Sequence, residues 1–409
     1  MIFMVINFKE KFFPGIFHKL KEKVGGLSKK EKSIAIIALT LIAVFIVTFA
    51  FSCFGIVSFQ AIGARIASSV NSSEKNFPIS VDTNKVINIG SLGGGFMVLT
   101  DKEVRVYSSA GKLKYQDVHN FSKPSFSSSG KNAVVFDRGS DGYMLLDTEK
   151  IICTGNAPGT IITAEISRNG CCAFSTYGDD CTSMLSVYDN SSRLVFQWKC
   201  TYEYISVLAL SDNGKFCGAA LINSDNGDIY SKVQYFGIDY SEPLNNVTVT
   251  GTVPLDLAFT KSDTLTLFGD NGIYNIGRHS EEAKCVTEYF SPELNSISLN
   301  SDNEYLAALA KYASTNVFEI NLFSRSGKLK RVITVNESVK SVTMSDKYVF
   351  ALAENKIMVY NYRGKVISEI KLDGSVYNIL PNDKYIFIYS LDRISRAFSY
   401  GDSSVDIGM

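Results

Sequence analysis

Histidine, a common proton-transfer group and zinc ligand, is rare in this chain. The 409 residues include only His18, His119 and His279. A histidine-rich metal site or a Ser-His-Asp triad needs histidines placed among other polar side chains. His119 and His279 lie in stretches predicted as loops or strand ends, and we expect both at surface or turn positions. The sequence therefore predicts no catalytic residue, no metal ligand and no bound cofactor.

Cysteine is more frequent, but its spacing does not define a known site. Cys53 lies in a long apolar segment, and the other seven are Cys153, Cys171, Cys172, Cys181, Cys200, Cys217 and Cys285. Because seven is odd, at least one of these thiols is unpaired within the chain. Strand neighbours could join Cys171 or Cys172 to Cys181 or Cys217 in a disulfide. We prefer the alternative that they are small buried hydrophobic residues.

Glycine-rich and acidic stretches are interpreted as turns. Gly90–Gly95 has no Gly-Lys-Ser/Thr after it, and Ser125–Lys131 departs from the phosphate-loop pattern at both ends. Ser224–Asp228 and Asp179-Asp180 lack the alternating carboxylates and distal glutamate of a calcium loop. A pair of acids for glycoside hydrolysis could come from distant parts of the chain, and the sequence does not select one.

A repeat explains how the rest of the chain is organised. Each unit has a short apolar strand, a polar turn, a strongly apolar strand, a strand ending in aromatics, a glycine turn and a last strand. The first turn recurs at Gly94, Ser129, Asn169, Asp212, Asp263, Asp302, Asp346 and Asp383, at intervals of 35, 40, 43, 51, 39, 44 and 37 residues. This is the period of a four-stranded propeller blade. We expect an all-β propeller of seven or eight four-stranded blades.

The last unit contains too little sequence for four strands. After Asp383 about two strands remain, so a segment from the other end of the domain should complete this blade. Residues 77–81, Phe-Pro-Ile-Ser-Val, are the predicted donor. A count of seven, with one weak copy wrongly divided, stays open.

The glycine turns carry a resemblance to WD-repeat and quinoprotein-like propellers. Three Gly-Lys hairpins show it, at residues 107–115, 323–331 and 360–368. In quinoprotein-type blades a tryptophan after this turn docks on the next blade. The comparable positions here hold Tyr115, Arg331 and Ser368, and the only tryptophan is Trp198. The Gly-His and Trp-Asp dipeptides of WD repeats are absent. The resemblance implies a propeller fold and carries little about function.

An apolar segment precedes the repeat. Residues 33–59 have no charged side chain and would reach roughly 40 Å as a helix, enough to cross a bilayer core of about 30 Å. Ser28 and Glu31 have the spacing of a capping box. This apolar run is longer than that of a cleaved signal peptide, and the residues around Cys53 do not fit a lipoprotein site. We predict one uncleaved transmembrane helix, in contact with membrane lipid.

Charge sets the expected orientation. Residues 1–32 carry eight lysines and three glutamates, and the remaining residues carry 33 basic and 38 acidic side chains. The positive-inside rule places residues 1–32 in the cytoplasm and exports residues 77–409 as the propeller, with 60–76 as a linker. Residues 1–24 could lie on the inner leaflet or form a frayed tail. The mildly acidic propeller gives no support to nucleic-acid binding.

The whole arrangement resembles the membrane-anchored propeller proteins of clostridial, Gram-positive bacteria, a family without an assigned activity. The leading hypothesis is a non-enzymatic binding or scaffolding module whose protein or cell-envelope ligand lies on a propeller rim. The alternatives are an extracytoplasmic hydrolase or quinone-cofactor enzyme, which needs clustered acids or an aromatic cavity at the channel, and an ectodomain sensor.

Overall fold

A computed structural model describes residues 76–398 apart from 83–84, 260–262, 289–293, 300–304, 311–316, 325–327 and 383. The chain divides into two compact units, Met1–Lys75 and Asn76–Met409. The predicted basic segment 1–32, the predicted membrane helix 33–59 and nearly all of the linker 60–76 lie outside the described residues. In the part of the chain that is described, no helix is long and apolar enough to cross a membrane.

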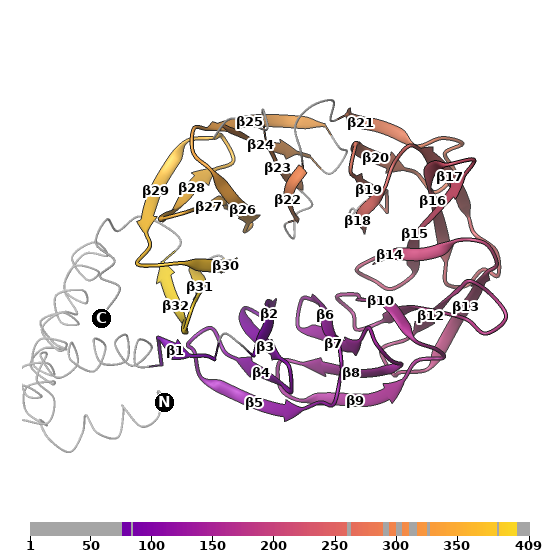
Figure 1. Cartoon of the computed structure of the whole chain (residues 1–409), viewed down its shortest axis with the longest axis horizontal. Helices are drawn as coiled ribbons and strands as arrows, with labels where there is room; N and C mark the ends of the chain where they lie inside the picture. Colours follow the sequence, from indigo (N-terminus) through magenta and orange to yellow (C-terminus); the bar gives the residue numbers. More distant parts are fainter. Residues whose placement is uncertain are drawn as a thin grey trace, which may run out of the picture. The chain divides into compact units, whose positions relative to one another are not determined.

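The described residues form 32 strands in eight four-stranded antiparallel sheets, which we call blades. The blades follow one another around a ring, and the first strand of each lies nearest the centre (Figure 1). These inner strands are β2 (Val86–Leu92), β6 (Pro124–Ser129), β10 (Ile161–Ile166), β14 (Tyr204–Leu210), β18 (Pro254–Phe259), β22 (Leu294–Leu299), β26 (Val339–Met344) and β30 (Val376–Pro381).

The other strands of each blade lie successively further out. The second strands are β3 (Gly95–Thr100), β7 (Asn132–Asp137), β11 (Cys172–Thr176), β15 (Phe216–Asp225), β19 (Leu265–Gly269), β23 (Tyr305–Ala310), β27 (Tyr348–Ala353) and β31 (Tyr385–Ser390). The third are β4 (Glu103–Tyr107), β8 (Gly142–Asp147), β12 (Ser183–Tyr188), β16 (Asp228–Gly237), β20 (Gly272–Ile276), β24 (Phe318–Phe323), β28 (Lys356–Asn361) and β32 (Arg393–Phe398). The outer strands are β5 (Leu113–Val118), β9 (Ile151–Asn156), β13 (Leu194–Cys200), β17 (Asn245–Thr250), β21 (Lys284–Glu288), β25 (Leu329–Val335), β29 (Val366–Lys371) and β1 (Ile79–Ser80).

The last blade is completed from the other end of the domain, as predicted. Its strand order is β1-β32-β31-β30, and Ile79 pairs with Ile394. Phe77, just before β1, packs against Phe96 of the first blade and Phe387 of the last, with ring centroids 6.4 and 6.1 Å away. The predicted donor segment 77–81 is therefore confirmed, and the ring closes through a paired strand and an aromatic cluster.

The predicted first turns are also confirmed where they are described. Six of the eight markers lie at the turn between the first and second strands of a blade, and Asp302 and Asp383 lie outside the described residues. Two glycines show why this turn needs its composition. Gly93 and Gly94 have φ angles of 55° and 80°, in the left-handed region that side chains with a Cβ rarely adopt.

The hydrophobic core lies between the blades. Buried side chains form eight clusters, and each joins two neighbouring blades. In one of them, Leu92 and Met97 of the first blade meet Ala133 and Val135 of the second. The second strands are buried on both faces, as β3 and β7 show, which explains their continuous apolar sequences. A single blade could not bury these faces alone.

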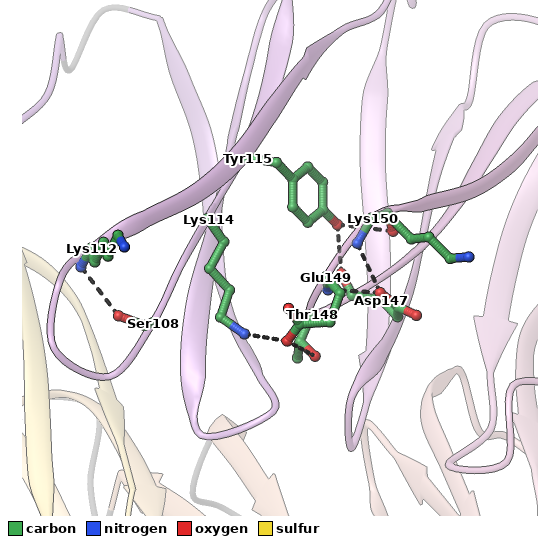
Figure 2. A network of polar contacts seen from close by, with 8 residues as sticks. All are labelled: Ser108, Lys112, Lys114, Tyr115, Asp147, Thr148, Glu149 and Lys150. Atoms are coloured by element: carbon green, nitrogen blue, oxygen red, sulfur yellow. Dashed lines mark hydrogen bonds and ion pairs between the residues drawn. The ribbon is translucent and has the colours of Figure 1, made fainter.

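The outer strands β5 and β9 contact the next blade through their third residue. Tyr115 of β5 donates its hydroxyl proton to the carbonyl oxygen of Asp147, 2.5 Å away, in the turn after β8 (Figure 2). Lys114 beside it pairs with Glu149 of the same turn. At the corresponding position, Cys153 of β9 lies 3.3 Å from the Ser192 hydroxyl of the third blade. Tyr115 therefore does what the docking tryptophan does in the resembling family.

Candidate functional site

The two ends of the ring are formed by different segments of the chain. One end holds the connections between blades and the turns between second and third strands, and we call it the connection face. Five cavities between about 310 and 710 Å³ are lined by these segments. Inner strands begin at this face because each follows a connection from the preceding blade. The connection face is therefore the place to look for a site.

Inner strands share a local irregularity close to this face. Their pairing with the second strand is interrupted by a β-bulge in every blade except the second, at the third residue in β14 and at the second residue in the others, for example at Leu255 of β18. A bulge changes the direction in which the following side chains point. In β18 the residue after the bulge is Asp256, whose carboxylate accepts a hydrogen bond from the Leu257 amide at 2.8 Å.

One cavity of about 310 Å³ lies among the inner strands β6, β10, β14 and β18. Its wall contains two carboxyl side chains from different blades, Glu165 of β10 and Asp256 of β18. Its lining also includes Leu255 and Arg138, which lie near the connection face, so the cavity reaches toward that face. Four neighbouring blades thus build one acid-lined pocket at the centre of the ring, which we call the channel cavity.

Desolvation sets the protonation of these two carboxyls. Surrounding protein raises the pKa of Glu165 to about 8, opposed by a hydrogen bond from the Ser127 hydroxyl, while the negative charge of Asp256 adds to the rise. The pKa of Asp256 rises to about 6, also through desolvation and against the bond from the Leu257 amide. Near neutral pH, Glu165 therefore holds its proton while Asp256 is mostly ionised.

Exposed tyrosines flank this pocket on the connection face. Tyr204 begins β14, two residues before Ser206 of the cavity wall, and is 49% exposed. Its ring meets that of Tyr177, itself 51% exposed, edge to face at 6.1 Å. Tyr202, in the connection before β14, is 78% exposed. Large aromatic side chains with this exposure are typical of surfaces that bind a partner.

Acidic side chains dominate this part of the connection face. The walls of the channel cavity and of two further cavities, of about 370 and 710 Å³, include two basic side chains, Arg138 and Lys232. The same walls include six acidic side chains: Asp141, Glu165, Asp179, Glu203, Asp228 and Asp256. We call the surface formed by these residues and the three tyrosines the acidic sector. A cavity of about 540 Å³, which shares Ser125 and Arg138 with the channel cavity, adds Lys123 and no acidic side chain.

The two histidines of the propeller have structural or surface positions. His279 is exposed in the turn after β20, as expected. The surface expectation for His119 is wrong, because only 5% of it is exposed. Its ring stacks on Phe121, its Nδ1 accepts the Phe121 amide proton at 3.3 Å, and its Nε2 lies 3.2 Å from the Thr100 carbonyl oxygen. These local partners explain why a polar ring is buried here.

The seven cysteines of the propeller are free thiols. Cys171, Cys172, Cys200 and Cys217 are buried, which confirms their interpretation as small buried hydrophobic residues. Cys153 and Cys181 are only half-buried, and the interpretation is wrong for Cys285, which is exposed. Burial raises the pKa of the Cys172 and Cys217 thiols. The alternative of a disulfide between strand neighbours is wrong.

The stretches interpreted as turns are turns. Gly90–Gly95 and Ser125–Lys131 each contain the hairpin between a first and a second strand. Ser224–Asp228 contains the hairpin between β15 and β16, where Asn226 and Gly227 have positive φ angles. Asp179-Asp180 lies between β11 and β12, and Asp180 pairs with Lys199. Among the described residues, no group of three or more His, Cys, Asp or Glu side chains could hold a metal ion.

Sequence reasoning did not select Glu165 or Asp256. They are 91 positions apart, and each stands in a short strand that is otherwise mostly apolar. The sequence signal that could have identified each acid is its position in the inner strand, because other copies of the repeat have a neutral residue there. An alignment of the inner strands would show it, but the bulges shift those strands by one residue relative to their partners.

The model of a family described as "Family of unknown function (DUF5711)" matches residues 68–394. No curated protein matches the sequence. Sqt1 of Saccharomyces cerevisiae is similar in structure, with 13% identity, a TM-score of 0.53, and coverage of 78% of this chain and 98% of that one. BamB of Moraxella catarrhalis is also similar in structure, with 13% sequence identity and a TM-score of 0.50, and the match covers 78% of this chain and 98% of that one. For the C-terminal WD40 domain of Sif2, the sequence identity is 12% and the TM-score 0.55, and the match covers 79% of this chain and 99% of that one. At such identities these likenesses show the β-propeller fold alone.

Proposed function

We propose that this chain, which belongs to the DUF5711 family of unknown function, is a membrane-anchored binding module whose propeller lies outside the cytoplasmic membrane. The apolar segment 33–59 and the lysines before it support the anchor and its direction. The ligand, a protein or an envelope polymer, is held on the connection face.

One observation carries this proposal: exposed tyrosines stand beside an acid-lined pocket at the centre of the ring. Tyr177, Tyr202 and Tyr204 are each exposed by about half or more, on the same sector as the channel cavity. Other exposed apolar side chains are distributed over the outer strands, over inner strands, as at Ile87, Leu255 and Tyr377, and over turns, and exposed apolar side chains scattered in this way are ordinary on a protein surface.

Affinity capture tests the proposal. The full chain, solubilised in detergent, serves as bait for membrane extract and cell-wall fragments of the source cell, and mass spectrometry identifies bound material. We expect a saturable ligand whose capture is lost in the Tyr177→Ser/Tyr204→Ser variant. Tyr240→Ser is the matched control, because Tyr240 is 57% exposed in the turn after β16, at the opposite end of the ring.

Two results would reject the connection face as the binding surface. One is equal capture by the Tyr177→Ser/Tyr204→Ser variant and by the unmodified chain. The other is loss of capture in Tyr240→Ser alone. Absence of any saturable ligand would reject the binding function itself.

The pocket also favours a second candidate, a glycoside hydrolase. Hydrolysis of a glycosidic bond uses one protonated and one ionised carboxyl, and Glu165 and Asp256 hold unequal pKa values in one cavity. The test is release of reducing ends from cell-wall glycan by the full chain. Turnover that Glu165→Gln abolishes without unfolding the protein would replace the binding proposal, and no turnover would leave binding as the better one.

A further inference from the structure

The fold does not require a negative charge at Asp256. In β2 and β30 the residue after the bulge is Asn88 or Asn378, and each side chain accepts the next backbone amide at 2.8 Å. Asp256 makes the same bond to Leu257 at the same distance. A neutral amide therefore serves this structural role in two blades, and the charge of Asp256 is additional to it.

A carboxyl at Glu165 is equally unnecessary for packing. Glu165 lies three residues after the bulge of its strand. The same position holds Gly90 in β2, Ala209 in β14, Ala258 in β18, Thr343 in β26 and Leu380 in β30, all neutral residues. Both acids thus replace neutral side chains, and both line the same cavity. Placing an ionised carboxylate there has a free-energy cost that a bound cation would offset.

The surroundings of the cavity fit a basic ligand larger than a single ion. The acidic sector has six acidic and two basic side chains, and one of the basic ones, Lys232, is 3.2 Å from the Glu203 carboxylate. Tyr177 and Tyr204 offer exposed ring faces, which attract ammonium and guanidinium groups. The two further cavities of the sector give room for a peptide chain.

We propose that the acidic sector binds a basic peptide segment of a partner protein, with one lysine or arginine side chain entering the channel onto Glu165 and Asp256. The inference rests on the proposed binding function and names the chemistry of its ligand. The channel carboxylates neutralise the inserted side chain, and the tyrosines and outer acids hold neighbouring basic residues.

Fluorescence anisotropy with the full chain in detergent tests this, at pH 8 and low salt. The probe is a labelled heptapeptide of alternating glycine and lysine, and its partner probe has every lysine acetylated. We expect the lysine peptide to bind at least tenfold more tightly. The Glu165→Gln/Asp256→Asn variant should weaken lysine-peptide binding at least tenfold.

A matched variant controls for total charge. Asp117→Asn/Glu242→Gln also removes two negative charges, from exposed side chains outside the acidic sector. Asp117 accepts the Val118 amide at 2.8 Å, as Asp256 accepts that of Leu257, so the local bond is matched too. We expect this variant to bind within twofold of the unmodified chain. Equal losses in both double variants would reduce the effect to net charge and overturn the inference.

The pH dependence of the unmodified chain gives evidence that needs no mutation. The groups facing Glu165 are Asp256, Cys172, Cys217 and, on the cavity wall, Arg138. Burial raises the pKa of both thiols, which therefore stay neutral between pH 5 and 8, and the two carboxyls have their shifted pKa values in or near this range. Affinity for the lysine peptide should fall at least tenfold from pH 8 to pH 5. Constant affinity would overturn the inference.

The two proposals fail in different ways. If a captured partner remains bound to Glu165→Gln/Asp256→Asn while the lysine peptide does not bind the unmodified chain, the binding function stands and the basic ligand is wrong. Equal binding of the acetylated peptide also overturns the basic ligand. If neither a partner nor the lysine peptide binds, both proposals fail.

Discussion

Replacing Glu165 by glutamine should stabilise the propeller at high pH and leave it nearly unchanged at low pH. The carboxyl is desolvated between blades, and its pKa rises from 4.5 to about 8. Between these values the folded state binds more protons than the unfolded state. Stability therefore falls as pH rises through this window.

The structure gives an upper limit for this effect. At about 1.4 kcal/mol for each pH unit, the change in pKa corresponds to at most about 5 kcal/mol at pH 8. Glu165 keeps some access to the channel, and water there screens the charge. We therefore expect about 2 kcal/mol of stabilisation by Glu165→Gln at pH 8, and less than about 0.5 kcal/mol at pH 4.5.

Thermal unfolding followed by circular dichroism at pH 4.5 and pH 8 measures the difference. With about 2 °C for each kcal/mol in a large domain, Glu165→Gln should raise the midpoint by about 4 °C at pH 8 only. Glu242→Gln, at an exposed position outside the cavity, should shift neither midpoint. A variant that is destabilised at both pH values, or equally stabilised at both, would refute the desolvated carboxyl as the cause.

Three further predictions concern packing and thiol access. Tyr115→Phe should cost about 1 kcal/mol in chemical unfolding, because it removes the hydrogen bond to Asp147 while keeping the ring; an unchanged midpoint would contradict this. Gly90→Ala should destabilise the fold, since its Cβ would lie 2.4 Å from the Phe126 ring, and Phe126→Ala in the same chain should recover part of the loss. A thiol reagent should label exposed Cys285 rapidly and buried Cys217 only after unfolding, so rapid labelling of folded Cys217 would be inconsistent with its burial.

Much of the architecture could be predicted from the sequence because every blade of a propeller has the same strands and turns and therefore needs similar residues at the same positions. Each blade needs the same polar first turn, and markers such as Asn169 and Asp212 occur where the structure places that turn. The incomplete last copy predicted that residues 77–81 would close the ring, because a two-stranded remainder leaves an unpaired edge. These features depend on local spacing and on strand count, which a sequence displays directly.

Contacts between blades were harder to predict because they depend on register across the ring. Tyr115 stood at the position of the docking tryptophan, and its hydroxyl reaches the next blade. The single Trp198 also meets the next blade, with its ring 5.1 Å from that of Phe236, but two residues further along its outer strand than that position. His119 looked like a loop residue, yet its ring fills a buried space within the first blade. Side-chain identity alone does not show which face such residues occupy.

The candidate site consists of exceptions to the repeat, which is why periodicity could not reveal it. Neutral residues occupy the position after the bulge in β2 and β30, but β18 has Asp256 there, and Glu165 stands where other inner strands have neutral residues. The β15–β16 hairpin has ten residues in each strand, where β3 has six, and its tip lines a cavity of the acidic sector. All three departures occur in three consecutive blades, the third to the fifth. Other blades have neutral residues at these strand positions, and β3 has six residues where β15 has ten, so the fold does not need the three departures. The ligand binding that we propose on the connection face would give them a physical role.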